Sequence, residues 1–176
     1  MQQIDQGLRH TKAGGTQIFP TSILLVTDGS REATLAAEVT VDLVNGTGSE
    51  LHVVHVVSTV QEPPYPRHFA TERTEDILEA KKLHALTLLD KRIAWIEKLG
   101  GKVAGSHYRE GKPDEEVIRL GEELDVGLVI TSDRKLGWLE RTFARSFSER
   151  VLSRANRPVL VVREPASPTR MALDQR

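Results

Sequence analysis

Short apolar runs alternate along this sequence with longer amphipathic stretches. The runs are rich in Val, Ile and Leu, which is typical of strands buried on both faces of a sheet. They cover residues 22–28, 51–57, 126–131 and 158–162, with a weaker fifth run at 102–109. Helices are expected at about 31–45, 73–99, 113–124 and 142–155. Strands that alternate with helices predict crossover connections, and therefore an open, mostly parallel α/β sheet with helices on both faces.

Serine, glycine and proline positions suggest where these elements end. Ser30 stands directly before the first helical stretch, where a serine hydroxyl is a favoured N-cap. Gly100 and Gly101 are expected to end the second helix. The apolar residues at helical spacing in that helix are Leu86, Leu89, Ile93 and Ile96. An irregular stretch at about 58–71 contains three prolines and follows the second strand, at the end of the sheet where such folds bind ligands, although a surface loop is the simpler interpretation.

The chain length favours one domain with two tails. A chain of 176 residues suits a single hydrophobic core. Residues 1–19 and 165–176 are polar and lack strand or helix periodicity, so they are expected to be flexible tails around a domain of residues 20–164.

Charge and composition indicate which classes of binding partner and which cellular location to expect. Lys and Arg number 24 against 25 Asp and Glu, so no net field favours nucleic acid or an anionic membrane. No apolar run approaches the ~18 residues of a membrane span, and the N-terminus does not resemble a signal peptide. Cysteine is absent, which excludes disulfides and thiolate sites. We therefore expect a cytoplasmic protein that binds neither nucleic acid nor membrane.

The histidines do not form a recognisable metal or catalytic pattern. His52 and His55 are three apart on a predicted strand and so point to opposite faces. His84 and His107 are interpreted as isolated, and no histidine follows His107 to complete a hydrolase triad. The sequence therefore predicts no metal ion and no catalytic residue.

Three stretches together resemble the universal stress protein family. The first two are ILLVTDGSREA, where a strand ends in an Asp before a Gly-Ser turn, and the strand LHVVHVV. The third is the closing segment DVGLVITSDRKLGWLERTFARSFSERVLSRANRPVLVV, which aligns with the family without a gap. The resemblance covers roughly residues 20–164. It implies a five-stranded sheet of order 3-2-1-4-5 with the Rossmann-like fold called adenine nucleotide alpha hydrolase-like.

The same resemblance implies where a nucleotide, ATP or AMP, would bind. Asp28 and Val56 match the positions that hold the adenosine part in nucleotide-binding members. The full set of expected contacts is Thr27, Asp28, Val56, Thr131, Ser132, Lys135, Arg145, Ser146 and Phe147. Without a ligand, the alternative is that Asp28 bonds the amides of its own turn and Ser30 only caps a helix.

This chain departs from the family at the phosphate loop. Ser132, Lys135 and Arg145 occupy the places where nucleotide-binding members have glycines, and Ser146 keeps its residue type. Glycine there lets backbone amides close on phosphate oxygens, a freedom that side-chain-bearing residues lack. Arginine and lysine side chains offer phosphate contacts of another kind. We therefore expect weakened nucleotide binding.

The last strand, at 158–163, is apolar and led by Pro158, so it resembles an exposed sheet edge. In the family this strand pairs with its twin, which implies a homodimer; cover by the C-terminal tail is the alternative.

The function these features imply is a stress-response binding protein that acts through an unidentified protein partner and is not an enzyme. A nucleotide-free adaptor is the alternative, and a slow ATPase is less favoured.

Overall fold

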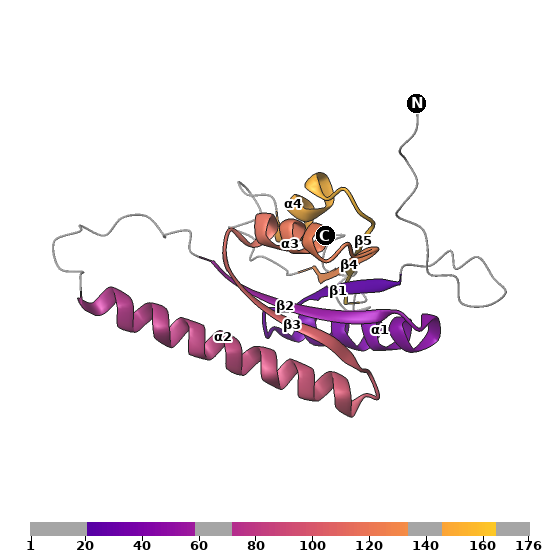
Figure 1. The fold of residues 1–176 in the computed structure, drawn as a ribbon, viewed down its shortest axis with the longest axis horizontal. Helices are drawn as coiled ribbons and strands as arrows, with labels where there is room; N and C mark the ends of the chain where they lie inside the picture. Colours follow the sequence, from indigo (N-terminus) through magenta and orange to yellow (C-terminus); the bar gives the residue numbers. More distant parts are fainter. Residues whose placement is uncertain (1–20, 59–71, 134–145, 165–176) are drawn as a thin grey trace, which may run out of the picture.

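The computed structural model describes residues 21–58, 72–133 and 146–164 (Figure 1). Nine elements follow one another in this part of the chain. They are β1 (Ser22–Val26), α1 (Arg31–Thr47), β2 (Glu50–Ser58), α2 (Glu72–Lys98), β3 (Val103–Gly111), α3 (Pro113–Glu123), β4 (Leu128–Ser132), α4 (Phe147–Arg154) and β5 (Val159–Val162). Every expected strand and helix is present, with ends that differ by a few residues; the expected start of the last helix, at 142–145, lies outside the described residues.

The five strands form one sheet in the order β3-β2-β1-β4-β5, and every pairing is parallel. The predicted fold class and strand order are therefore confirmed. β1 is the central strand, with β2 on one side and β4 on the other. Helices α1 and α2 cover one face of the sheet, and α3 and α4 cover the other (Figure 1).

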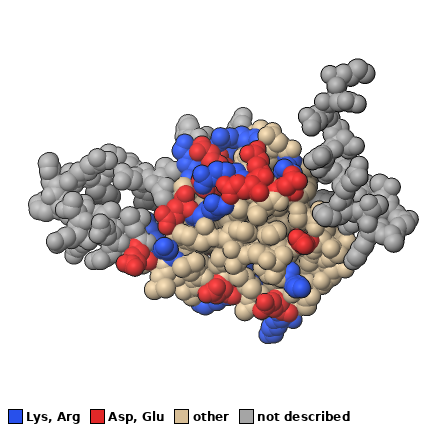
Figure 2. Space-filling model, in the orientation of Figure 1, with Lys and Arg blue, Asp and Glu red and all other residues tan. Residues whose placement is uncertain are grey.

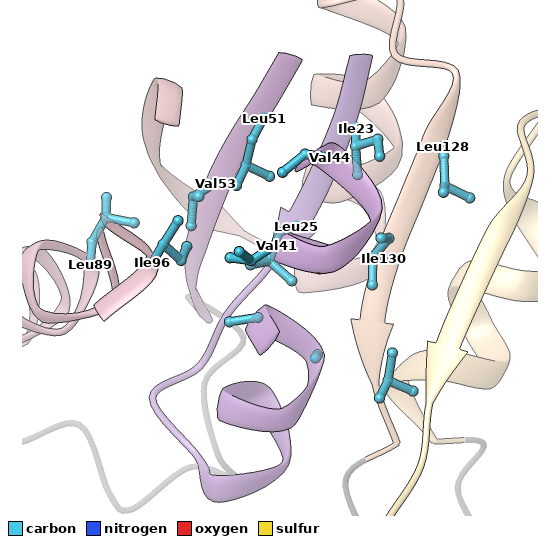
Figure 3. Close-up of a cluster of buried hydrophobic side chains, with 13 residues drawn as sticks. Ile23, Leu25, Val41, Val44, Leu51, Val53, Leu89, Ile96, Leu128 and Ile130 are labelled. Carbon is cyan, nitrogen blue, oxygen red and sulfur yellow. The ribbon is translucent and has the colours of Figure 1, made fainter. Parts of the chain in front are cut away.

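The alternation of side chains along β1 divides the core into two clusters. Ile23 and Leu25 point toward α1 and α2, where Val41, Val44, Leu89 and Ile96 meet them (Figure 3). Leu24 and Val26 belong to the second cluster, under α3 and α4. Because a central strand is covered on both faces, all four of these β1 side chains are buried, and the strand has no polar face.

Ser30 and Gly48 set the two ends of α1. The hydroxyl of Ser30 accepts the backbone N–H of Ala33 at 3.1 Å, which confirms the predicted N-cap. Gly48 ends the helix with a φ of 71°, and its N–H donates to the carbonyl of Val44. A left-handed residue at that place favours glycine, since glycine has no Cβ penalty.

Helix α2 buries less of its predicted apolar face than its spacing suggested. Leu89 and Ile96 are buried and Ile93 packs against the first core cluster, whereas Leu86 is 36% exposed. Leu86 therefore shares the helical spacing of the other three residues without sharing their burial. α2 runs along one side of the sheet and extends past it in Figure 1, so the sheet covers only part of this helix.

Helices α3 and α4 are joined by ion pairs around one buried carboxylate. Asp114, whose side chain is 7% exposed, accepts from Arg150 Nε at 3.2 Å and from Arg154 at 2.8 Å. In Figure 2, acidic and basic side chains are interleaved over these two helices. Within the described residues, no helix has the length and hydropathy that crossing a bilayer would need.

Candidate functional site

An open groove of about 640 Å³ lies between the carboxyl end of β2 and helix α2. His55, Val56, Val57 and Ser58 line it from β2, and α2 lines it with residues between Ala80 and Leu88. Asp28, in the turn that joins β1 to α1, completes the lining. The groove therefore lies at the carboxyl ends of parallel strands, which is where open α/β sheets bind their ligands.

The turn that carries Asp28 is held by its own hydrogen bonds. The N–H of Ser30 donates to Asp28 Oδ1 at 2.9 Å, and Ser30 in turn caps α1. Gly29 has a φ of 78°, and a Cβ at that residue would lie 3.0 Å from Leu88 Cδ2 on α2. The positive φ of this turn favours glycine, and Leu88 of α2 packs closely against it. The bond from the Ser30 N–H is the turn contact expected of Asp28 without a ligand.

His55 is a buried imidazole of the groove lining. Its side chain is 8% exposed, and its Nδ1 has no hydrogen-bond partner among the described residues. Burial lowers the pKa of His55 below its ordinary value, and the charge of His84 adds to this effect. The carboxylate of Asp28 and the backbone of Thr27 oppose it. The folded environment therefore favours the neutral form of His55.

A buried arginine lies behind the same turn. Arg92 of α2 is 7% exposed; its Nε donates to the hydroxyl of Thr27 at 3.3 Å, and a terminal nitrogen donates to the carbonyl of Ser30 at 3.3 Å. Burial lowers its pKa, and the charges of Asp28 and Glu38 oppose that shift. Sequence reasoning missed this residue. Its position could have indicated burial, because Arg92 stands four residues before Ile96, on the apolar face of an amphipathic helix.

Two of the expected nucleotide contacts meet in the groove. Asp28 and Val56 both line it, and Thr27 is buried directly before Asp28. Thr131 and Ser132 are buried at the end of β4, which pairs with β1 on the side away from β2. These residues thus lie at the carboxyl ends of neighbouring strands.

The other expected contacts have different positions. Ser146 is the N-cap of α4: its hydroxyl accepts the N–H of Glu149 at 3.2 Å, and its own N–H donates to the Glu149 carboxylate at 3.0 Å. Phe147 packs against the second core cluster. Lys135 and Arg145 lie outside the described residues.

A short chain of hydrogen bonds connects β4 to the start of α4. Ser148 donates to the carboxylate of Asp133 at 3.2 Å, and the hydroxyls of Ser146 and Ser148 are 3.0 Å apart. Neither Asp133 nor Ser148 was among the site residues expected from the sequence. These bonds hold together the two residues that border the segment in which the phosphate loop was expected.

The interpretation of His84 and His107 as isolated histidines is wrong. His52 Nδ1 and His107 Nε2 are 3.2 Å apart on the neighbouring strands β2 and β3, and His84 lines the groove together with His55. Because His52 contacts His107 while His55 lines the groove, His52 and His55 do not share a site. Among the described residues, no group of three or more metal-ligating side chains comes together.

An open parallel sheet with a groove at the carboxyl ends of its strands is the architecture in which α/β proteins commonly bind their ligands. The sequence pattern of the universal stress protein family matches residues 21–163, so the chain belongs to the universal stress protein family. A universal stress protein of Synechocystis sp. is 31% identical over 150 residues, which cover 85% of this chain and 89% of that protein.

Solved structures share the fold. A universal stress protein in complex with cAMP superposes with a TM-score of 0.64 at 15% identity, covering 81% of this chain and 97% of that one. The universal stress protein of Archaeoglobus fulgidus in complex with dAMP gives a TM-score of 0.53 at 23% identity, with the same coverage of 81% and 97%. At these identities the likeness concerns the fold.

Proposed function

We propose that this chain is a stress-response binding protein that takes an adenine nucleotide, ATP or AMP, with low affinity in the groove beside Asp28. The observation that carries the proposal is that Asp28 and Val56 line one groove of about 640 Å³. Nucleotide-sized ligands usually occupy pockets of roughly 300 to 1,000 Å³, so the volume suits such a ligand.

The position of the groove supports the same ligand class. β1 has β2 on one side and β4 on the other, so the crossover connections leave the sheet in opposite directions at β1. Such a switch point opens a crevice at the carboxyl ends of β1 and β4, where nucleotides are frequent ligands. Asp28 follows β1 and lines the groove, so the groove borders this crevice on the β2 side. Two structures of this fold, with cAMP and with dAMP, contain adenine nucleotides.

The groove side chains fit the parts of a nucleotide. The carboxylate of Asp28 can accept hydrogen bonds from ribose hydroxyls. Val56 and Val57 offer apolar contact to a base, and the exposed side chains of Lys81 and His84 supply donors on the α2 side. Apolar lining with a few polar groups is the usual composition of a small-molecule site.

The low affinity follows from the substituted loop. Ser132 is buried in β4 at a place where nucleotide-binding relatives are expected to have glycine, and Lys135 and Arg145 occupy the other two such places. A side chain at these positions restricts the backbone amides that would otherwise surround a phosphate. Lysine and arginine also lose rotamer entropy when they hold a phosphate.

We propose further that the protein acts as a homodimer. β5 is one edge of the sheet, and Leu160 on it is 36% exposed. Pairing of β5 with its copy would cover this apolar edge and give a homodimer. We propose that the dimer works in the cytoplasm by binding a protein partner, and that nucleotide occupancy of the groove is read by that partner without a chemical reaction.

A titration of matched aspartate variants tests this function. Asp28→Ala should weaken ATP binding by about tenfold or more, because hydrogen bonds to a charged group contribute about 1.5–3 kcal/mol. Asp42→Ala, which removes an exposed carboxylate from the outer side of α1, should leave the affinity within about twofold of the wild type, since distant exposed charges are screened. Isothermal calorimetry or NMR line shifts measure both.

Two outcomes would contradict the proposal. Equal loss of affinity in Asp28→Ala and Asp42→Ala would show that ATP responds only to net charge. No saturable binding of ATP, AMP or cAMP up to about 10 mM, a free energy weaker than about −3 kcal/mol, would favour the nucleotide-free adaptor.

A further inference from the structure

Helix α2 contacts the Asp28 turn through two residues that are one helical turn apart. Leu88 lies against Gly29, close enough that a Cβ there would meet its Cδ2 at 3.0 Å. Arg92 donates to both Thr27 and Ser30. Residues at i and i+4 share one face of a helix, so a single face of α2 holds the whole turn.

The two acceptors of Arg92 stand on either side of Asp28. Thr27 precedes the aspartate and accepts through its hydroxyl; Ser30 follows two residues later and accepts through its carbonyl. Ser30 also donates its N–H to the Asp28 carboxylate. The arginine therefore bonds to both ends of the segment that presents Asp28 to the groove.

Arg92 is buried deeply enough for these contacts to be specific. The side chain is 7% exposed, and a guanidinium removed from water must be compensated by hydrogen bonds and nearby charge. Thr27 and Ser30 supply the hydrogen bonds, and Asp28 and Glu38 supply the negative charge. Movement of the turn away from α2 would leave this cation without its acceptors.

We propose that Arg92, supported by Leu88, is the positioning residue of the groove, holding Thr27 and Ser30 so that Asp28 faces the ligand. Ligand affinity then depends on how α2 packs on the turn. This inference deepens the proposed nucleotide function, and its ligand test rests on that function. The positioning itself can be measured in ligand-free protein.

The first experiment compares two amides that have the same kind of cap. The N–H of Ala33 donates to the Ser30 hydroxyl at 3.1 Å, and the N–H of Glu149 donates to the Ser146 hydroxyl at 3.2 Å on α4. In Arg92→Met, hydrogen exchange at Ala33, followed by NMR, should accelerate about tenfold, while Glu149 stays within about twofold. Global destabilisation would accelerate both amides alike and would overturn the proposal.

Two further substitutions show whether the effect depends on the place of Arg92 in the fold or only on its positive charge. Lys91→Met removes an exposed cation from the adjacent residue of α2 and should leave the Ala33 amide unchanged. Arg92→Lys keeps the charge and can reach one of the two acceptors, so exchange at Ala33 should fall between wild type and Arg92→Met. Equal acceleration by Lys91→Met and Arg92→Met would contradict a specific role for Arg92.

A double-mutant cycle tests the direct contact. Thr27→Val removes the hydroxyl that accepts from Arg92 Nε at 3.3 Å and keeps the side-chain volume. If the contact positions the turn, Arg92→Met should accelerate the Ala33 amide by less than about threefold in the Thr27→Val background, because part of its effect is already lost. Full additivity would contradict the coupling.

A second experiment measures the affinity of the same variants for ATP. Arg92→Met should raise the ATP dissociation constant about tenfold, and Lys91→Met should change it less than about twofold. If the exchange effect is present and no variant binds ATP, positioning stands and the nucleotide function fails. If ATP binds and Arg92→Met changes neither exchange nor affinity, the nucleotide function stands and the inference about Arg92 fails.

Discussion

The backbone N–H of Ser30 donates to a carboxylate oxygen of Asp28 over 2.9 Å, so the direction of this carboxylate is set by its own turn. The same Ser30 caps α1 through its hydroxyl, which connects the turn to the helix that follows it. An acceptor that is oriented before a ligand arrives loses less entropy on binding. The groove therefore contains at least one preorganised polar contact.

Asp114 should be important for the packing of α3 against α4. Asp114→Asn removes the charge that pairs with Arg150 and Arg154, and we expect the free energy of unfolding to fall by about 1–3 kcal/mol. Urea denaturation measures this change.

Asp125→Asn is the matched control. Asp125 is 81% exposed and pairs with Arg157 at 2.7 Å, and asparagine tolerates its positive φ of 49°. An exposed pair contributes less than about 1 kcal/mol. A larger loss in Asp125→Asn than in Asp114→Asn would show that burial does not decide the strength of these pairs.

Stability should decrease as the pH falls from about 7.5 to 5. His55 has a pKa below its ordinary value of 6.5 because it is buried, so the unfolded chain takes up a proton that the folded protein does not. This favours unfolding as the pH drops through 6.5 toward the lower folded pKa. One such proton contributes at most about 1.4 kcal/mol per pH unit.

Two histidine variants test the origin of this dependence. His55→Gln should flatten the slope of unfolding free energy against pH, measured by urea denaturation at several pH values. His84→Gln removes an exposed imidazole from the same groove and should keep most of the slope. An unchanged slope in His55→Gln would assign the pH dependence to other groups, with His107, whose pKa burial also lowers, as the next to examine.

The proposed dimer can be tested at the β5 edge. Leu160→Lys should weaken association, because a lysine would be buried where the two strands pair. Leu83→Lys introduces the same charge at a leucine of α2 that is 67% exposed and should leave association unchanged. Light scattering gives the mass of each variant; a wild-type protein that is monomeric at tens of micromolar, roughly the level of an abundant cellular protein, would remove the dimer from the proposal.

The sequence predicted the elements that depend on local pattern. β1 was recognisable because a central strand is buried on both faces, and the N-cap at Ser30 because its bond spans three residues. The family resemblance assigned Asp28 and Val56 to one binding site, and both residues line the groove.

Contacts between distant segments could not be predicted in the same way. Arg92 and Thr27 are 65 positions apart, and their hydrogen bond depends on how α2 packs on the sheet. The contact of His52 with His107 depends on the β2–β3 register, which shifts between Leu51 and His52. A one-residue shift of this kind changes which side chains meet across a sheet.

The most direct test of the central claim is the affinity of the unmodified protein for ATP, measured by isothermal calorimetry. We predict saturable binding with a dissociation constant above about 100 μM, equivalent to about −5.5 kcal/mol. Glycine at Ser132, Lys135 and Arg145 together should tighten it, and Asp28→Ala should reverse that gain. A dissociation constant of a few micromolar for the unmodified protein would contradict the account, because the substituted loop would then hold phosphate as well as a glycine loop does.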